Sequence, residues 1–513
     1  MKLVFEKLDP KQKFFILNLI TGLAAGVVSI LLHQGIYYLM ELFGTSSGFT
    51  LKSFLLGGLS LAMGSYIVTR VMPSCSGSGI PRTKVLLAVQ HGVISTKEWL
   101  TKIVTTILSL ASGVPLGSEG PTIAIAAGVG SSLGRRFRLP ERKVKSLVYA
   151  GASAGIAAAF NTPIAAVIFT MEEIIGNSSV KSMGPILISS LVASITAAAL
   201  IGQNSVFTPV SYSFNSSFEL TFYLALGIVA GLAGPLFISQ IIAIRQMTRK
   251  YFKHHKFTLS MFAFLVVGGI SLYVPEITGN GLSVVNQLLQ GHAKEWSALA
   301  VLLIVKFIAC AFCYGAGISG GILMPVLFLG ATLGGLFGIV STQVFSLSEV
   351  EIGAYCLVGM GSFFASVMRT PFTSIIIVFE MTHDYRIVLP LMLSCLVSYF
   401  LSERIKPGTI YERVAHDEGY ELPGHEDEDL LNQTIVEDIF LSKPGKVTEA
   451  LPYVRSVYPD QSLSVALVKL RRLEKGESLI VIDRMNPEII LGELTLQNVF
   501  DFLSRKETLT SSL

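Results

Sequence analysis

Charged residues are scarce in this sequence. Asp, Glu, Lys and Arg make up 14% of its 513 residues, whereas 51% are hydrophobic, and a soluble globular chain carries about 25% charged residues. Several stretches contain no charged residue and are long enough for one or two membrane passes of roughly 20 apolar residues each. They are 14–40, 53–69, 146–171, 183–218, 220–244 and 307–348. The sequence therefore predicts an all-α polytopic membrane protein.

The motifs of several enzyme classes are also missing. No HExxH and no P-loop is present, so the sequence supports neither a zinc protease nor transport driven by ATP. Cys310 and Cys313 form a CxxC, but they share one face of an apolar helix, which makes a redox or metal role a weak reading. We predict that the protein is not an enzyme and has no cofactor or metal. A GxSxG pattern around Ser319, with His383 downstream, leaves an intramembrane serine protease as a remote alternative.

The charges that are present are distributed unevenly. Residues 412–513 hold 19 of the 35 acidic and 11 of the 39 basic residues, so residues 1–411 have a net charge of +12 and the tail −8. A basic membrane part suits anion attraction, but it also fits ordinary positive-inside loops, which we favour. The two strongest basic clusters, 135–145 and 245–256, are expected to be cytoplasmic together with the tail.

The tail divides into two parts. Residues 412–433 are polar and acidic, and they contain Pro423 and Gly424, which is typical of a linker. Residues 434–513 are expected to form a small α/β domain. Its predicted helices are 462–473 and 496–503, and its predicted strands are 478–483 and 488–492.

The membrane part, residues 1–411, repeats itself. Thr162–Glu173 matches Thr370–Met381, and Gly77–Ile80 matches Gly279–Leu282 at nearly the same separation. Gly-rich segments ending in Pro121 and Pro325 also correspond. We place the two halves at about 50–200 and 218–405. Repeated halves whose apolar segments are broken by Gly and Pro indicate a transporter, and the breaks point to its binding site.

Three loop-to-helix starts could hold an anion. They are Ser78–Pro81, Gly117–Pro121 and Gly320–Pro325, and none contains Lys or Arg. A helix N-terminus supplies roughly half a positive charge together with free backbone N–H groups. Partial charges hold an anion without trapping it, which a fast pathway requires.

Two acidic residues are candidates for proton coupling. Glu119 is the only charge between Ile103 and Gly134, and an intramembrane carboxylate marks a functional site by default. At an anion site it would compete with the anion for the same N–H groups and leave when protonated. Glu172 and Glu173 end an apolar run. Glu172 has a repeat mate in Glu380, which suggests a structural role, so Glu173 is the better relay candidate.

At these residues the chain resembles the CLC family of chloride channels and transporters. Gly77-Ser-Gly-Ile-Pro81 is similar to the family's GSGIP, Gly117-Ser-Glu-Gly-Pro121 to its gate segment, and Gly320–Pro325 to GGxFxP. The segment from Phe160 to Glu173 resembles the helix with the inner proton glutamate. This resemblance implies a CLC-type inverted repeat, a homodimer and, in a bacterium, the inner membrane.

The resemblance also implies roles for individual residues. Glu119 would be the outer gate and Glu173 the inner proton relay. Chloride would be held by the hydroxyls of Ser78 and Tyr411 and by the N–H groups of Ile322 and Leu323. The pore would be lined by the surrounding motif residues, which are Gly77, Gly79, Ile80, Pro81, Gly117, Ser118, Gly120, Pro121, Gly321 and Pro325.

Some positions depart from the family pattern. Arg82 stands where Glu is usual, Ser118 where Arg or Lys is common, and Leu323 where the motif has an aromatic residue. We expect these changes to affect pore polarity or proton access. The predicted activity is chloride/proton antiport. A passive chloride channel on the same scaffold is the alternative, and Glu173 favours exchange because channels of this family usually lack an acid there.

The tail resembles a single CBS motif. Gly492–Asn498 is similar to a GxxTxxD segment that contacts an adenosine nucleotide, with Asn498 in place of Asp. The usual module has two such motifs, and we find one. An adenine nucleotide is therefore the weaker reading of this segment, and contact between the tails of a dimer is the one we prefer.

Overall fold

The protein folds into two compact units, residues 1–422 and 423–513. We describe them separately, from a computed structural model. The described residues are 9–45, 50–176, 183–202, 207, 219–252, 254–292, 295–345, 351–420, 434–446, 455–470, 473, 477–483, 486, 489–499 and 501–502.

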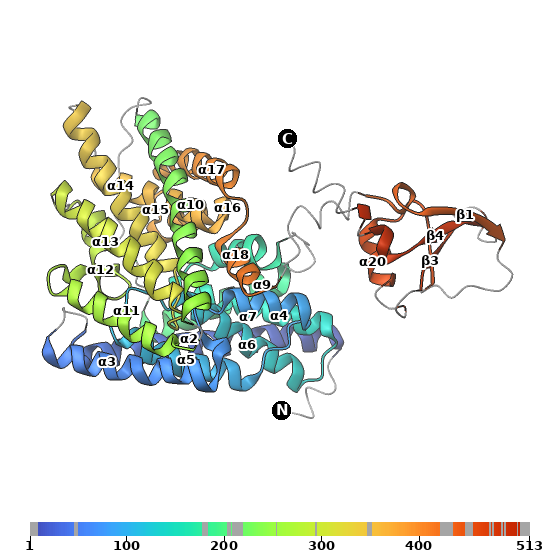
Figure 1. Cartoon of the computed structure of the whole chain (residues 1–513), viewed down its shortest axis with the longest axis horizontal. Coiled ribbons are helices and arrows are strands. Elements are labelled where there is room, and N and C mark those ends of the chain that lie inside the picture. The colour runs from blue at the N-terminus through green and yellow to red at the C-terminus, as the bar shows by residue number, and fades with distance from the viewer. Residues whose placement is uncertain are drawn as a thin grey trace. The chain divides into compact units, whose positions relative to one another are not determined.

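The first unit consists of helices (Figure 1). Seven of its described helical segments are long and apolar enough to cross a membrane, as the charge-free stretches predict. Its α-helices are α2 Pro10–Phe43, α3 Leu51–Tyr66, α4 Ile80–Val89, α5 Thr96–Ala111, α6 Glu119–Arg136, α7 Glu141–Phe160, α8 Pro163–Phe169, α9 Met183–Ile201, α10 Glu219–Tyr251, α11 Lys256–Ser271, α12 Leu282–Leu289, α13 Trp296–Gly315, α14 Leu323–Phe345, α15 Ile352–Met368, α16 Pro371–Thr382, α17 Val388–Ile405 and α18 Ile410–Asp417. Short π or 3₁₀ segments adjoin them: η1 Ile67–Val71, η2 Pro73–Cys75, η3 Thr170–Ile175, η5 Pro275–Ile277 and η6 Tyr385–Ile387.

The repeat seen in the sequence is a repeat of packing. In the first half α6 packs on α7, α7 on α9 and α9 on α2, and in the second α14 packs on α15, α15 on α17 and α17 on α10. Helix α2 is thus the equivalent of α10. The first half consequently begins near residue 10 rather than near residue 50. A signal was present in the sequence, because Gly22 and Gly26 of α2 have the same spacing as Gly227 and Gly231 of α10. These glycines pack against α9 and α17, respectively.

Glu172 and Glu380 fasten the two halves to each other. The carboxylate of Glu380 accepts hydrogen bonds from the backbone N–H groups of Ile164 and Ala165, at 3.0 and 2.8 Å, at the start of α8. In the same way Glu172 accepts from the N–H groups at the start of α16, at 3.1 and 2.7 Å. Negative charge is favourable at a helix N-terminus. The structural role suggested for Glu172 is confirmed, and the reciprocal contact is the one a two-fold related repeat requires.

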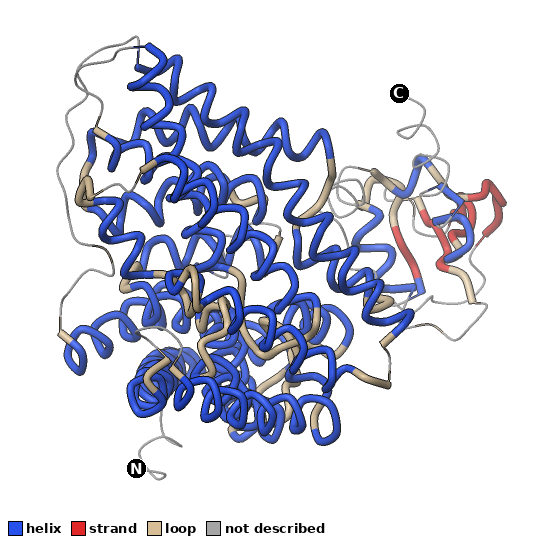
Figure 2. The backbone as a smooth tube through the Cα atoms, turned by 60° about the vertical axis from the view of Figure 1, so that its left-hand side comes forward, coloured by secondary structure: helices blue, strands red, loops and turns tan. Residues whose placement is uncertain are grey.

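Helices in this unit are interrupted where the motifs lie. Figure 2 shows these non-helical segments in tan among the blue helices. Gly77 and Gly79 precede α4 with positive φ angles of 62° and 84°, and Gly279 and Gly281 precede α12 with 58° and 78°. A side chain is disfavoured in this region of backbone conformation. The equivalent loops of the two halves thus share one backbone shape.

The second unit is built around a four-stranded sheet with strand order β1-β4-β3-β2. Its elements are η7 Val436–Asp438, β1 Leu441–Lys446, β2 Ser456–Val457, α20 Leu463–Leu470, β3 Leu479–Ile482 and β4 Ile489–Leu494. Strand β4 pairs antiparallel with β1 and β3, and β2 pairs parallel with β3. Residues 496–499 and 501–502 are helical, as expected for the second helix. This is the small α/β fold that the sequence predicts.

Two details of the tail bear on the sequence predictions. Helix α18 belongs to the first unit and extends past residue 412, where we placed the start of the linker. In the CBS-like segment, the Asn498 side chain accepts hydrogen bonds from the N–H and hydroxyl of Thr495, and Asn498 N–H donates back to the Thr495 hydroxyl. The polar groups of this motif therefore cap their own helix.

Candidate anion and proton site

Three loops that interrupt helices meet inside the helical unit. Gly117 and Gly321 exchange backbone hydrogen bonds of 2.8 and 2.6 Å, and Gly320 N–H donates to the carbonyl of Gly77 at 3.1 Å. These loops lead into α6, α14 and α4, respectively. The first-turn N–H groups of a helix have no partner within the helix. The three loop-to-helix starts named from the sequence are thus gathered around one position.

Glycine makes this approach of the loops feasible. A Cβ on Gly120 would lie 2.7 Å from Ser78 Cβ, and one on Gly321 would lie 2.9 Å from the backbone nitrogen of Gly120. Both separations are too short for non-bonded heavy atoms. The motif glycines therefore allow the starts of α4, α6 and α14 to touch.

Ser78 lies at this meeting point. It is buried, its hydroxyl oxygen accepts a hydrogen bond from Ile80 N–H, and it lies 3.3 Å from the hydroxyl of Tyr314. The sequence did not single out Tyr314, which ends α13 just before the Gly-rich loop. Its position beside that loop was the available signal.

The other predicted chloride ligands come from α14 and α18. Ile322 and Leu323 are buried at the start of α14, where their N–H groups belong to the unpaired first turn. Tyr411 is fully buried on α18, which packs on α4, and its hydroxyl has no hydrogen-bond partner in the part of the chain that the structure describes. A buried hydroxyl without a partner is costly, because its bonds to water are lost. It is therefore available to a ligand.

Glu119 occupies the start of α6, with 5% of its surface exposed. One carboxylate oxygen, Oε1, lies 3.3 Å from the hydroxyl of Ser118, and Oε2 has no hydrogen-bond partner among the described residues. The Oε2 atom lies directly against Gly117. The acidic group therefore turns back toward the loop that meets Gly321, as a group competing with an anion would.

Glu173 is fully buried in η3, a π-helical turn. Its Oε1 accepts hydrogen bonds from the ammonium of Lys84 at 2.7 Å and from the Thr409 hydroxyl at 3.2 Å. Its Oε2 lacks a partner among the described residues. Lys84 also reaches Glu412 at 3.2 Å. The sequence did not single out Lys84, Thr409 or Glu412. Lys84 lies only three residues after the GSGIP motif, which was the signal.

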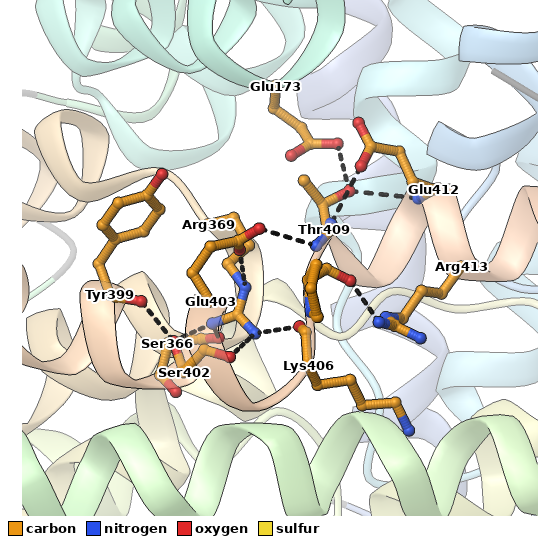
Figure 3. A network of polar contacts seen from close by, with 12 residues as sticks. Glu173, Ser366, Arg369, Tyr399, Ser402, Glu403, Lys406, Thr409, Glu412 and Arg413 are labelled. Carbon is orange, nitrogen blue, oxygen red and sulfur yellow. Dashed lines mark hydrogen bonds and ion pairs between the residues drawn. The ribbon is translucent and has the colours of Figure 1, made fainter. Parts of the chain in front are cut away.

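A polar network anchors the loop that precedes α18 (Figure 3). The guanidinium of Arg369, at the end of α15, binds the backbone carbonyls of Ser402 and Lys406 at 2.7 and 2.8 Å and the carboxylate of Glu403 at 2.8 Å. Glu403 in turn accepts from Gly408 N–H at 3.1 Å. This network fixes the start of α18, and with it both Thr409 beside Glu173 and Tyr411.

Two buried lysines hold the Gly-rich loops. The ammonium of Lys102 donates to the carbonyl of Cys75 at 2.8 Å and to that of Gly77, and Lys306 donates to the carbonyl of Gly279 at 3.0 Å. In the sequence these lysines directly precede stretches with few or no charges, and no motif marks them. Their similar spacing from the repeated motifs, 25 residues after Gly77 and 27 after Gly279, could have identified them as a pair.

A cleft of about 600 Å³ leads to Ser78. Its lining includes Gly77, Ser78 and Tyr314 together with basic side chains from α10 and α11, namely Arg245, Arg249 and Lys256. Such a basic mouth raises the local concentration of anions by electrostatic attraction.

Ser319, the centre of the GxSxG pattern, is enclosed by other hydroxyls. Its oxygen lies 3.3 and 3.2 Å from the hydroxyls of Thr105 and Thr106. His383 instead ends α16 with a left-handed backbone conformation. A serine nucleophile requires an adjacent base, and the described neighbours of Ser319 provide hydroxyls in that place.

The fold and the converging loops agree with what comparison with known proteins shows. Residues 57–403 match the model of the voltage gated chloride channel family. The chain belongs to this family, the CLC proteins.

Curated relatives and solved structures cover most of the chain. It is 35% identical over 364 residues to a putative chloride channel protein, ClcB-like, of Ralstonia nicotianae. This match covers 70% of this chain and 82% of that protein. It is 30% identical over 417 residues to the H(+)/Cl(-) exchange transporter ClcA of Vibrio cholerae, over 78% of this chain and 88% of the relative. A slow cyanobacterial Cl⁻/H⁺ antiporter superposes with a TM-score of 0.73 at 24% identity, covering 80% of this chain and 99% of that structure. A eukaryotic CLC transporter gives 0.69 at 20% identity, over 96% and 88%. The inverted-repeat CLC fold follows from these likenesses.

Proposed function

We propose that this protein exchanges chloride for protons across a membrane, with Glu119 as the outer gate and Glu173 as the inner proton relay. One observation carries the proposal. Two buried carboxylates lie in the helical unit, one at the start of α6 among three converging helix N-termini, and each has an oxygen without a partner among the described residues. Relatives named as H(+)/Cl(-) exchangers and as a chloride channel support the choice of ions.

The anion would be held by dipoles. The hydroxyls of Ser78 and Tyr411 and the first-turn N–H groups of Ile322 and Leu323 supply partial positive charge. Tyr314, which contacts Ser78, adds a further hydroxyl. These groups replace part of the hydration shell of chloride without the strong attraction of a full charge, so the ion can leave again.

Glu119 would gate this site by competition. As a carboxylate it is attracted to the same N–H groups at the starts of α6 and α14, and once protonated that attraction falls. The acid then swings out, chloride enters, and the proton is carried by the moving side chain. One group therefore couples both ions.

The basic clusters support an assignment of the two sides of the membrane. Helix α6 starts with Glu119 and ends with Arg135 and Arg136, and at about 1.5 Å per residue its ends lie some 25 Å apart. The positive-inside rule assigns the basic end to the cytoplasm. Glu119 then belongs to the outer half of the membrane.

Glu173 would serve the inner side. Its partner Lys84 lies on α4, and α4 ends close to His91, which lies 3.8 Å from Glu141 at the start of α7. That end of α7 belongs to the cytoplasmic basic cluster. In this orientation the cleft lined by Ser78 and by the basic residues Arg245, Arg249 and Lys256 opens to the cytoplasm. The tail that follows α18 then also lies in the cytoplasm. The membrane is the inner membrane if the protein is bacterial, and two copies form a homodimer with one pathway each.

A passive chloride channel remains the second candidate, and Lys84 is the observation that favours it. The ammonium of Lys84 lies 2.7 Å from Glu173, so the two charges form an ion pair, as in a purely structural contact. If this ion pair is purely structural, only anion flow remains.

Flux measurements in liposomes separate these functions. Purified protein is reconstituted, a chloride gradient is imposed, and proton and chloride movements are recorded together. We expect chloride to drive protons against their own gradient, and Glu173→Gln to stop proton movement while chloride still flows. Chloride flux without coupled protons in the unaltered protein would establish the channel and remove the role of Glu173.

A further inference from the structure

Ser118, which precedes the gate residue, also contacts a histidine. Its hydroxyl oxygen lies 3.3 Å from Oε1 of Glu119 and 3.0 Å from Nε2 of His33, a residue of α2. The other ring nitrogen, Nδ1, lies 2.8 Å from the carbonyl oxygen of Ser29. A carbonyl only accepts, so Nδ1 carries a proton and donates it. In the neutral ring Nε2 is therefore an acceptor, and it faces Ser118.

We propose that His33 and Ser118 form a proton relay between Glu119 and the outer solution. The step balances without a co-reactant. The protonated Glu119 gives its proton to the Ser118 oxygen, while the Ser118 hydroxyl proton passes to Nε2 of His33. The products are a Glu119 carboxylate, a Ser118 hydroxyl and a His33 imidazolium. Rotation of the ring away from Ser118 then lets Nε2–H give its proton to water, which leaves the neutral ring with its proton on Nδ1. The reverse sequence loads the gate. This inference rests on the proposed function of Glu119.

His33 lies at the appropriate end of its helix. The ammonium of Lys143, in the basic cluster, lies 5.3 Å from the centre of the Phe14 ring near the start of α2. His33 follows Phe14 by nineteen residues, or about 28 Å of helix. It therefore lies toward the membrane face opposite to the basic cluster, the outer face in our assignment. The residue His33 is half-buried, whereas Glu119 is 5% exposed, so the relay leads from a buried acid to a residue that is less buried.

Other titratable groups on the helices around His33 have partners of their own or lie at the far end of α2. Tyr37, one turn further along α2, has its hydroxyl engaged with Asn280. Helix α9, which packs on α2, has no charged residue. On α5 the ammonium of Lys102 is bound to backbone carbonyls. The charged residues of α6 and α7 other than Glu119 belong to the basic cluster at the far end of α2. Ser118 replaces the Arg or Lys common at this position, which could not pass on a proton in the same way.

The test compares variants in reconstituted liposomes over a range of pH. We expect His33→Ala and Ser118→Ala each to slow coupled proton flux about tenfold, since a positioned proton acceptor contributes at least that much. Both should also shift the pH dependence of transport. The double variant should be no slower than the single ones. His292→Ala, at an exposed histidine after α12, is the matched control and should behave like the unaltered protein.

A structural role for His33 would give a different result. His33→Gln keeps a polar group that can hydrogen-bond to Ser118 but cannot carry a proton near neutral pH. If this variant restores both the rate and the pH profile, His33 only positions Ser118 and the relay is wrong. An unchanged pH profile in His33→Ala would also overturn it.

Different results would contradict the proposed relay and the proposed antiport activity. If antiport is absent in the unaltered protein, the proposed function fails, and the relay is then read from the outer-pH dependence of chloride flux. In a Glu119→Gln background, where chloride flux persists, the effect of His33→Ala on the outer-pH dependence of chloride flux should disappear, because the relay acts only through that carboxyl. An effect of equal size in that background would contradict the inference.

Discussion

The two halves of the helical unit share their architecture but not their acids. Each half breaks its helices at a Gly-rich loop held by a buried lysine, Lys102 in one and Lys306 in the other. In the first half Glu119 opens α6, whereas Leu323 opens α14 in the second. Likewise Glu173 has Met381 as its repeat mate. Duplication therefore gave one scaffold twice, and the two acids that we propose carry protons, Glu119 and Glu173, both lie in the first half.

This difference explains how a symmetric scaffold can move two different ions. Both halves contribute helix N-termini, which attract an anion through partial charges. A proton requires a titratable group at each stage, and one such group at each stage is sufficient. The second half can therefore use apolar residues that pack, as the buried Leu323 and Met381 do.

The largest effect is expected at the residue that separates the halves most clearly. Glu119→Gln keeps the shape of the side chain but removes its titration. We expect proton movement to stop while chloride flux persists, a loss of at least about tenfold, or about 1.4 kcal/mol, in the coupled rate. Simultaneous chloride and proton recordings in liposomes provide the measurement. Proton movement that persists in this variant would show that proton transport does not depend on Glu119 in the first half.

The halves also differ at the turns that precede α8 and α16. Asn161 and Arg369 both adopt positive φ, at 54° and 61°, but Arg369 additionally anchors the loop before α18. We expect Arg369→Ala to lower the free energy of unfolding by about 2–3 kcal/mol through lost charged hydrogen bonds. Asn161→Ala should cost about 1 kcal/mol, for backbone conformation alone. Thermal unfolding in detergent checks both, and equal losses would show that the Arg369 network contributes little.

A variant at Lys84 tests whether this residue influences Glu173, the proposed proton relay. Lys84→Met keeps most of the side-chain volume and removes the cation beside Glu173 and Glu412. Because the remaining carboxylates lose their charge partner, we expect the number of protons moved per chloride to change several-fold while chloride flux is largely kept. An unaltered ratio would show that Lys84 is only a structural partner. Arg82→Met, two residues earlier and paired with Glu98, is the control for loss of positive charge.

The smallest effect is expected where the halves are alike. Glu172→Gln and Glu380→Gln each weaken a carboxylate contact with a helix N-terminus, which is worth about 1 kcal/mol. We expect similar decreases in thermal stability and unchanged proton coupling. A loss of coupling in Glu172→Gln would place this acid in the proton pathway and reduce the distinction we draw from Glu173.

The sequence alone determined the class of this protein and much of its plan. Scarce charge indicated membrane helices, and the repeated Gly/Pro motifs identified two related halves and three helix starts around one position. These features are local, because hydropathy and helix breaking depend on neighbouring residues. The start of the first half was placed too late, because the Gly22 and Gly26 pair of α2 was not matched to Gly227 and Gly231 of α10.

Only the tertiary structure decided which side chains meet. Tyr314 beside Ser78, Lys84 and Thr409 beside Glu173, and His33 beside Ser118 join residues that are 85 to 236 positions apart in sequence. Such contacts depend on how helices cross, which no short pattern records. The physical reason is that a buried polar group must find a partner wherever the packed helices place one.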